Sequence, residues 1–266
     1  MQNYCKNIGA LAAASALVAG TALAGSPTAP APAPAPAADS SVAYNLHVGY
    51  TSEYLWRGLN LGQDLVEAGF NMKTEYNGLG ISAGAWYGSY DTGYYNRQLG
   101  TIREVDVDEL DLYAEVSKDF GFATAAVGYI YYFNEEAASQ NGYPGLDDSQ
   151  EAYVSLSRDL GFAKASLAYY WDIEGDNDGY TELALTRDFA LTSCLTLNVG
   201  TNVGYLFEQG QATAWTTKVG LDWAFVEKAK LTPFVALSVA LSDDWDTAYD
   251  GSGNEFVAGS MLSVSF

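Results

Sequence analysis

Basic residues, histidine and cysteine are scarce in this 266-residue chain. Lys and Arg total 12 against 33 Asp and Glu, which gives a formal net charge of -21. A chain this acidic repels phosphate backbones, so no nucleic-acid partner is expected. The single histidine is His47 and the two cysteines are Cys5 and Cys194, which excludes a Cys/His metal cluster. The sequence also contains no phosphate-binding glycine loop, and we expect no cofactor.

Long apolar runs are missing after residue 41. None reaches the roughly 20 residues that a transmembrane helix needs, and apolar and polar residues alternate with period two instead, most clearly at 42–51, 66–73, 195–203 and 215–225. One face of each segment carries Leu, Val and aromatic residues, and the other carries Gly, Ser, Asn and charges. This pattern is typical of membrane-spanning strands with a lipid face and a watery face.

Aromatic residues, in contrast, are abundant. The 20 Tyr, 11 Phe and 6 Trp argue against disorder despite the acidity. Tyr and Trp at this density suit the aromatic girdles of a membrane interface.

The N-terminal part of the chain indicates export. Lys6 precedes an apolar stretch at 8–24, which ends in Ala22-Leu23-Ala24 before Gly25. We therefore expect residues 1–24 to be a secretory signal peptide, so that Cys5 is removed with it and Cys194 has no disulfide partner. The Pro/Ala-rich residues 25–41 predict a disordered periplasmic linker, or alternatively an extended tether. Residues 42–266 remain for the folded domain.

The predicted fold is all-β, a transmembrane antiparallel up-and-down β-barrel of about twelve strands. The strands are expected near 42–57, 65–77, 79–90, 108–119, 122–134, 149–159, 162–172, 180–188, 194–207, 213–225, 231–242 and 255–266. Short turns at 77–78, 119–121, 159–161, 189–193 and 226–230 alternate with longer loops near 58–64, 91–107, 135–148, 173–179, 208–212 and 243–254. Short periplasmic turns and longer extracellular loops are the plan of bacterial outer-membrane barrels.

The last strand ends in an aromatic residue, Phe266. Such an ending is expected to be read by the barrel-assembly machinery of Gram-negative bacteria. In a closed barrel this strand must pair with the first strand near Val42.

Charged residues at the predicted inward positions suggest what the barrel encloses. Acids outnumber bases there, which favours cations. One interpretation is a narrow, weakly cation-preferring pore, and the other is that the charges pair across the lumen and plug it. The predicted lumen-lining residues are Glu53, Arg57, Glu67, Lys73, Glu75, Glu109, Asp111, Glu115, Glu151, Lys164, Asp172, Glu182, Lys218, Asp222 and Glu255.

Arg57 is the most distinctive of these positions. It lies four residues after Glu53, which is roughly 13 Å along a strand and too far for a direct pair. We expect Arg57 to pair with an acid on a neighbouring strand, as a structural ion pair at the mouth or as a clamp for a solute.

Two further features of the sequence are candidate functional sites. The acidic stretch Glu174-x-Asp176-x-Asp178-Gly179 has the spacing of a calcium loop, but Leu185 stands where the bidentate acid belongs, so a solvated loop is predicted, open to weak divalent bridging to lipopolysaccharide. His47 falls on the inward face, where a polar lumen group is expected rather than a catalytic base. The chain is accordingly predicted not to be an enzyme.

A resemblance to a known family adds to this prediction. The segment YTSEYLWRGLN at 50–60 contains Ser52, Tyr54, Arg57 and Gly58 in the order Ser-x-Tyr-x-x-Arg-Gly. It resembles the opening strand of the TorF-like porin family, the Gcw_chp type of bacterial outer-membrane β-barrel. The resemblance implies an outer-membrane location, contact with lipid and lipopolysaccharide, and a porin for passive diffusion of small solutes (ion transport). The alternative is a non-conducting structural or surface-interaction barrel.

Overall fold

The computed structural model describes residues 42–96, 101–134, 147–175, 178–242 and 254–266. The predicted signal peptide and linker at 1–41 lie outside these ranges, as do most of the predicted loops at 135–148 and 243–254. No helix in the described ranges has the length and hydropathy needed to cross a membrane.

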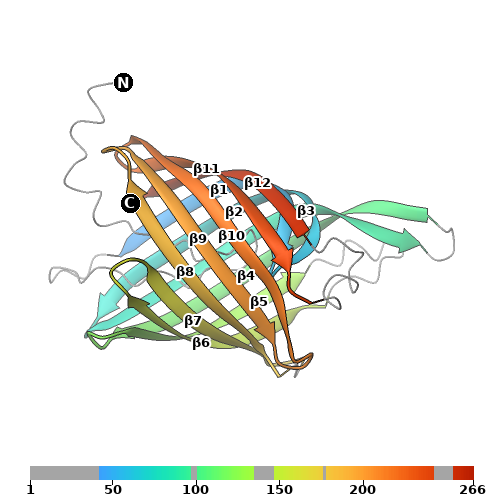
Figure 1. Ribbon diagram of the computed structural model, residues 1–266, viewed down its shortest axis with the longest axis horizontal. Helices are drawn as coiled ribbons and strands as arrows, with labels where there is room; N and C mark the ends of the chain where they lie inside the picture. Colours follow the sequence, from blue (N-terminus) through green and yellow to red (C-terminus); the bar gives the residue numbers. More distant parts are fainter. Residues whose placement is uncertain (1–41, 97–100, 135–146, 176–177, 243–253) are drawn as a thin grey trace.

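The described residues form twelve β-strands, the number that the sequence predicts (Figure 1). They are β1 (Ala43–Trp56), β2 (Leu59–Tyr76), β3 (Leu79–Asn96), β4 (Thr101–Asp119), β5 (Thr124–Asn134), β6 (Ser149–Asp159), β7 (Lys164–Asp172), β8 (Tyr180–Ala190), β9 (Leu195–Leu206), β10 (Gln211–Val226), β11 (Ala229–Ala240) and β12 (Asn254–Ser265).

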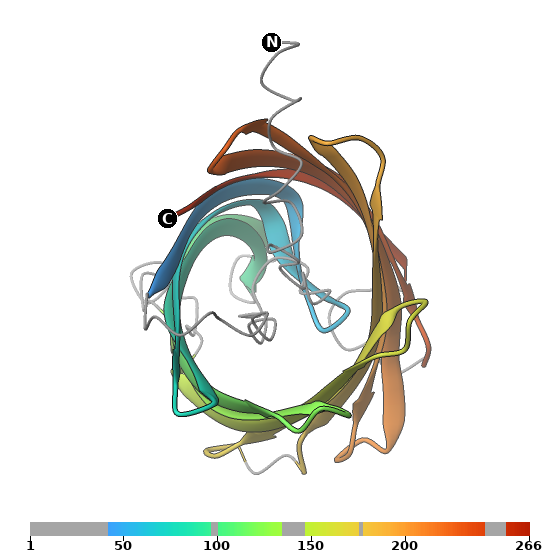
Figure 2. The same cartoon turned by 90° about the vertical axis from the view of Figure 1, so that its left-hand side faces the viewer.

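Each strand pairs antiparallel with its neighbours in the sequence, and β12 pairs with β1 to close the barrel. The seam runs from Asn45 opposite Ser265 to Thr51 opposite Gly259. Beyond it, the Phe266 N–H donates to the Tyr44 carbonyl at 2.9 Å. Figure 2 shows the resulting ring of strands seen from one end. The predicted closure by the last strand is therefore confirmed.

Alternating exposure along each strand separates the two faces of the wall. On β6, Val154 and Leu156 are 55% and 49% exposed, whereas Glu151 and Tyr153 are 4% exposed. The same phase continues on the other strands, with exposed Leu, Val and aromatic residues outside and buried polar residues and tyrosines inside. This inversion of the usual soluble pattern, apolar outside and polar inside, is characteristic of membrane-spanning barrels.

The short turns follow from local residue chemistry. Asn77 and Gly78 both adopt positive φ, 52° and 72°, as a two-residue hairpin turn between twisted strands requires. At two later turns the Asp side chain accepts a hydrogen bond from the N–H of the glycine two residues on, at 2.7 Å for Gly121 and 2.6 Å for Gly161. The turns predicted at these positions are confirmed.

Two predicted loops prove to be strand. The first hairpin turns on only Arg57 and Gly58, with φ of 52° and 87°, so the loop predicted at 58–64 is wrong. The loop predicted at 91–107 is also wrong over most of its length, because β3 and β4 stay paired out to Asn96 opposite Thr101. This pair forms an arm that projects beyond the barrel end (Figure 1). The polar composition of both segments suggested loops, but paired neighbouring strands satisfy their backbone hydrogen bonds.

Inward tyrosines pack over inward glycines on the adjacent strand. Tyr153 lies opposite Gly128, and a Cβ placed on Gly128 would be 2.3 Å from the Tyr153 ring. Tyr113 lies over Gly84 in the same way. The absence of a side chain at these glycines is thus what lets the large rings lie flat against the wall.

We predict that Gly128→Ala destabilises the barrel by about 1–3 kcal/mol, because the tightly packed Tyr153 ring must move. Gly220→Ala is the matched control: it is also an inward strand glycine, but its nearest neighbour is 3.3 Å away at Thr232 Cγ2. Urea unfolding in lipid vesicles measures both, and an equal loss in the two variants would refute the packing account.

Candidate functional site: a hairpin folded into the barrel

The β1–β2 hairpin extends further than the wall that holds it. Pairing of β1 with β12 stops at Thr51, and pairing of β2 with β3 stops at Gln63. Beyond these residues the backbones of β1 and β2 pair with each other, from Tyr54 opposite Gly62 to Trp56 opposite Leu59, and Glu53 lies opposite Gln63 at the base of this segment. We call residues 52–62 the tip hairpin. In Figure 2 the turn between β1 and β2 lies inside the ring of strands.

Local irregularities accompany the departure of the tip hairpin from the wall. The register shifts between Tyr54 and Leu55, which is a β-bulge that bends and twists a hairpin. A second shift lies between Gln63 and Val66, where β2 leaves β3. At the end of the seam, the Ser52 hydroxyl accepts a hydrogen bond from the Ala258 N–H at 3.0 Å. This bond gives the Ala258 N–H of β12 an acceptor at a point where the β1 backbone has stopped pairing with β12.

Apolar contacts hold the tip hairpin on its two sides. Tyr54 is fully buried in a cluster with Leu65, Trp86 and Tyr90, and the cluster continues to tyrosines on β4, β5 and β6. The next residue, Leu55, is fully buried in a second cluster with Phe234, Ala236 and Val257 of β11 and β12. Because consecutive residues point to opposite faces of a strand, the tip hairpin packs against two parts of the wall at once.

Arg57 ties the end of the tip hairpin to a distant strand. Its two terminal nitrogens donate to the two carboxylate oxygens of Glu151 on β6, at 2.7 and 2.6 Å. The two side chains are 7% and 6% exposed. An acid was expected on a neighbouring strand, and that expectation is wrong: β6 is far from β1 and β2 around the barrel, and Arg57 reaches it because the tip hairpin crosses the interior.

Aromatic rings surround the same guanidinium. The Arg57 Cζ atom lies 4.3 Å from the ring centre of Trp56, 4.8 Å from that of Tyr170 and 4.4 Å from that of Tyr180. The Tyr132 hydroxyl donates to Glu151 Oε2 at 2.9 Å and fixes the carboxylate. A guanidinium stacked on rings and bonded through two parallel N–H groups combines two strong modes of arginine recognition.

Further acids gather around the tip hairpin. Glu109 accepts a hydrogen bond from the Tyr54 hydroxyl at 2.9 Å, and the fully buried Asp111 lies beside Glu109. Glu53 on the hairpin lies beside Glu255 of β12. Glu182 accepts from Asn202 Nδ2 at 2.5 Å. Six of the predicted acids thus lie on the tip hairpin, contact it or lie next to an acid that does.

Other predicted residues lie away from the tip hairpin. Glu67 accepts from Trp86 Nε1 at 2.8 Å and Glu115 accepts from Tyr153 at 2.9 Å. Lys73 and Lys164 lie near Glu115, and Lys218 Nζ is 3.8 Å from the Phe234 ring centre. Asp222 pairs with Lys230 at 2.7 Å. Asp172 accepts from the backbone N–H groups of Glu174 and Gly175, and Glu75 is exposed at the turn end of β2.

Sequence reasoning missed the aromatic half of the site. Tyr132, Tyr170 and Tyr180 were not singled out, although they stand in the inward phase of β5, β7 and β8. An inward tyrosine in place of a small residue is the signal that could have identified them.

The acidic stretch at 174–179 and His47, the two further candidates from the sequence, are not part of the site around Arg57. Part of the acidic stretch 174–179 falls on residues 176–177, which are not described, and Glu174 Oε1 accepts from Gln150 at 2.6 Å. Within the described ranges no three His, Cys, Asp or Glu side chains are placed to share a metal ion. The His47 ring lies over Gly69, where a Cβ would be 2.2 Å from it.

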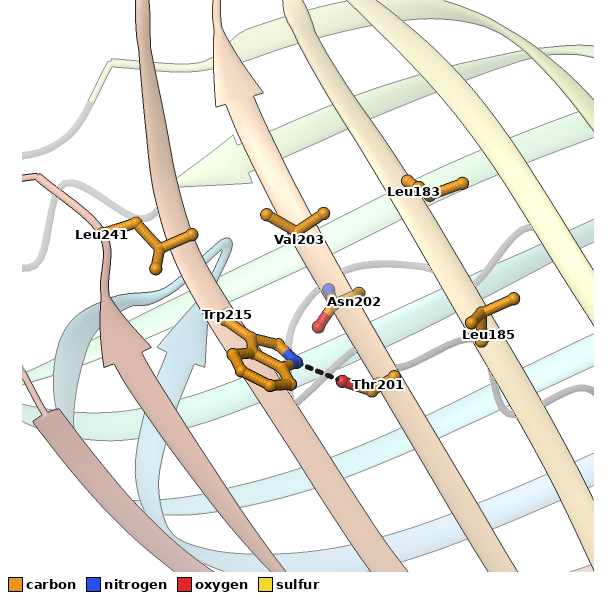
Figure 3. Close-up of a pocket in the computed structure, with 7 residues that line it drawn as sticks. All are labelled: Leu183, Leu185, Thr201, Asn202, Val203, Trp215 and Leu241. Carbon is orange, nitrogen blue, oxygen red and sulfur yellow. Dashed lines mark hydrogen bonds between the residues drawn. The ribbon is translucent and has the colours of Figure 1, made fainter.

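The outer wall has a hollow of about 250 Å³ between β8 and the end of β11 (Figure 3). Exposed Leu183, Leu185, Trp215 and Leu241 line it. The Trp215 indole N–H is already donated to Thr201 Oγ1 at 2.6 Å. The hollow therefore presents mainly apolar surface, so the polar candidate site is the one inside the barrel.

These features define a class: closed antiparallel barrels of twelve strands with an apolar outer face. Residues 35–257 match the family described as "Bacterial protein of unknown function (Gcw_chp)", and the chain belongs to this family. The resemblance predicted from Ser52, Tyr54, Arg57 and Gly58 is thereby confirmed. No relative is found among curated proteins.

Three solved structures are similar to this chain to different degrees. The COG4313 outer membrane channel from Pseudomonas putida F1 is 10% identical with a TM-score of 0.51, over 85% of this chain and 96% of that one. The KdgM porin is 11% identical with a TM-score of 0.47, over 84% and 99%. The NanC porin is 14% identical with a TM-score of 0.46, over 84% and 98%. At 10% identity, the similarity to the COG4313 channel shows a common fold and nothing more.

We predict that Arg57→Ala releases the tip hairpin. Removing one partner of a buried ion pair costs about 3–5 kcal/mol, so amide hydrogen exchange in residues 53–62 should accelerate by at least about 100-fold. Exchange in β10, which carries no residue in contact with Arg57, should not change.

Lys230→Ala is the matched control for this measurement. The pair of Lys230 with Asp222 is more exposed, at 28% and 19%, and its loss should cost no more than about 1 kcal/mol. Unchanged exchange of the tip hairpin in Arg57→Ala would show that apolar packing alone holds it.

Proposed function

We propose that this protein is an outer-membrane channel for the passive diffusion of small solutes, with a weak preference for cations. The observation that carries the proposal is the closed wall, which has exposed apolar residues outside and charged residues inside. Such a wall shields a polar path from lipid. The excess of carboxylates among the inward residues raises the local concentration of cations.

Under this proposal the outer face contacts lipid and lipopolysaccharide, and β12 with its exposed terminal Phe266 is the strand that the assembly machinery recognises. The predicted lumen residues then line or flank the solute path. No catalytic role is assigned to any of them. The carboxylates that accept hydrogen bonds from tyrosine, tryptophan, asparagine or arginine side chains of the barrel are those of Glu67, Glu109, Glu115, Glu151 and Glu182.

The tip hairpin favours a second candidate function, a non-conducting structural or surface-interaction barrel. Its two buried clusters and the ion pair with Glu151 brace the interior from β1 to β6. A barrel whose purpose is mechanical or adhesive would gain from such a brace. Conductance distinguishes the two candidates.

Purified protein in planar lipid bilayers should show channel steps. In a KCl gradient, the reversal potential should indicate a cation-to-anion permeability ratio above one. This ratio should fall toward one at high salt, because the Debye length shrinks from about 10 Å at 0.1 M to about 3 Å at 1 M. Absence of steps would support the non-conducting barrel, and anion preference would contradict the role of the acids.

The lipid-facing wall is tested by a pair of leucine variants. Leu167 lies mid-strand on the outer face of β7, 49% exposed, and Leu160 lies in the β6–β7 turn, 44% exposed. Leu167→Arg should destabilise the barrel in vesicles by about 2–4 kcal/mol, whereas Leu160→Arg should cost no more than about 1 kcal/mol. Equal costs in urea unfolding would indicate that β7 does not face hydrocarbon.

A further inference from the structure

The residues that bind Arg57 form a complete site on the barrel wall. Glu151 comes from β6, Tyr132 from β5, Tyr170 from β7 and Tyr180 from β8, so four consecutive strands build it without help from the tip hairpin. We call these four residues the guanidinium seat. Glu151 is 4% exposed, Tyr132 5% and Tyr180 3%.

The side chains of the guanidinium seat are also held by other residues of the wall. Tyr132 donates to Glu151 Oε2, and Tyr180 donates to Glu182 Oε2 at 3.3 Å. The Tyr170 ring lies between those of Tyr153 and Tyr180, with its centre 5.3 and 6.2 Å from theirs and tilted to both. These contacts fix the carboxylate and the ring faces through wall residues alone, so the seat would persist if the tip hairpin moved away.

The seat requires a cation. Without Arg57, the Glu151 carboxylate would be a buried charge that has lost its basic partner, and a buried unpaired charge is strongly unfavourable. A guanidinium meets the requirement better than an ammonium. Its planar fork matches both oxygens of Glu151, and its flat faces stack on tyrosine rings.

We propose that the guanidinium seat is a binding site for small organic cations that carry a guanidinium group, and that Arg57 occupies it as a tethered internal ligand. A free guanidinium compound takes the seat only when the tip hairpin leaves it. This inference rests on the proposed function, since it assigns a class of cationic solute to the interior of the channel.

In the wild-type protein, Arg57 has the advantage over a free guanidinium compound in competing for the guanidinium seat. A tethered ligand acts at an effective concentration of about millimolar or more, and the clusters around Tyr54 and Leu55 hold the tether in place. Free ligand should therefore bind the wild type weakly and bind well only when the Arg57 side chain has been removed.

Isothermal titration calorimetry tests the proposal with folded full-length protein in detergent at low salt. The probe is agmatine, which carries a guanidinium and an amine, and the control compound is 1,4-diaminobutane, which has two amines and no guanidinium. Arg57→Ala should bind one agmatine per barrel, at least tenfold more tightly than the wild type does and at least tenfold more tightly than it binds the diamine. Arg57→Ala/Glu151→Gln should lose this binding.

A heat-dependent gel shift confirms that each variant is folded, and Arg57→Met, which keeps an apolar stem, replaces Arg57→Ala if the latter does not fold. Lys230→Ala should bind agmatine as weakly as the wild type. The proposal is overturned if the Arg57 variant binds no better than the wild type, if binding survives Glu151→Gln, or if the diamine binds equally well. Because calorimetry does not depend on conduction, these outcomes are independent of whether the barrel conducts in bilayers.

Discussion

Backbone hydrogen bonding sets the main constraint on this molecule. Unpaired N–H and C=O groups cannot face hydrocarbon, so a sheet that crosses a membrane has to close on itself. The β1–β12 seam provides that closure from Asn45 opposite Ser265 to Thr51 opposite Gly259. β1 continues past the seam to Trp56, and its surplus length has no partner in the wall. Because the surplus segment forms a hairpin that turns inward, its backbone N–H and C=O groups bond to each other. The Ser52 hydroxyl accepts a hydrogen bond from the Ala258 N–H, which has no acceptor on the β1 backbone.

The interior follows from this surplus hairpin. Large inward tyrosines fit because glycines such as Gly84 and Gly128 leave room beside them. The rings belong to the same buried cluster as Tyr54, and their hydroxyls orient carboxylates such as Glu115 and Glu151. A buried arginine is held among these groups by charge and by ring faces together. The tip hairpin, which is formed by the first two strands, thus braces the barrel from inside.

Local patterns predicted the wall well because strand alternation and turn chemistry are local properties. The twelve strands, the Asn77-Gly78 turn and the closing strand at Phe266 all follow from neighbours in the sequence. The tip hairpin does not, because nothing in the sequence of residues 52–62 indicates that the wall ends at Thr51.

The site shows the same division between local and long-range information. The spacing along one strand correctly excluded a pair between Glu53 and Arg57, but it could not select Glu151, which lies 94 residues further along the chain. Closure of the barrel and the inward turn of the hairpin together bring these two residues into contact. The tyrosines of the seat were not recognised from the sequence, because a tyrosine in a membrane strand is also what an aromatic girdle at the membrane interface contains.

The tip hairpin lies inside the barrel, and we therefore predict that it limits conduction. Ser52 and Asp64 face each other between the pairs Thr51–Leu65 and Glu53–Gln63, so replacing residues 53–63 with Asn-Gly shortens the hairpin without changing its register. Single-channel recording in planar bilayers compares this variant with the wild type. The account predicts a severalfold larger conductance, or steps where the wild type shows none. Equal conductance in a shortened barrel that retains its heat-dependent gel shift would contradict it.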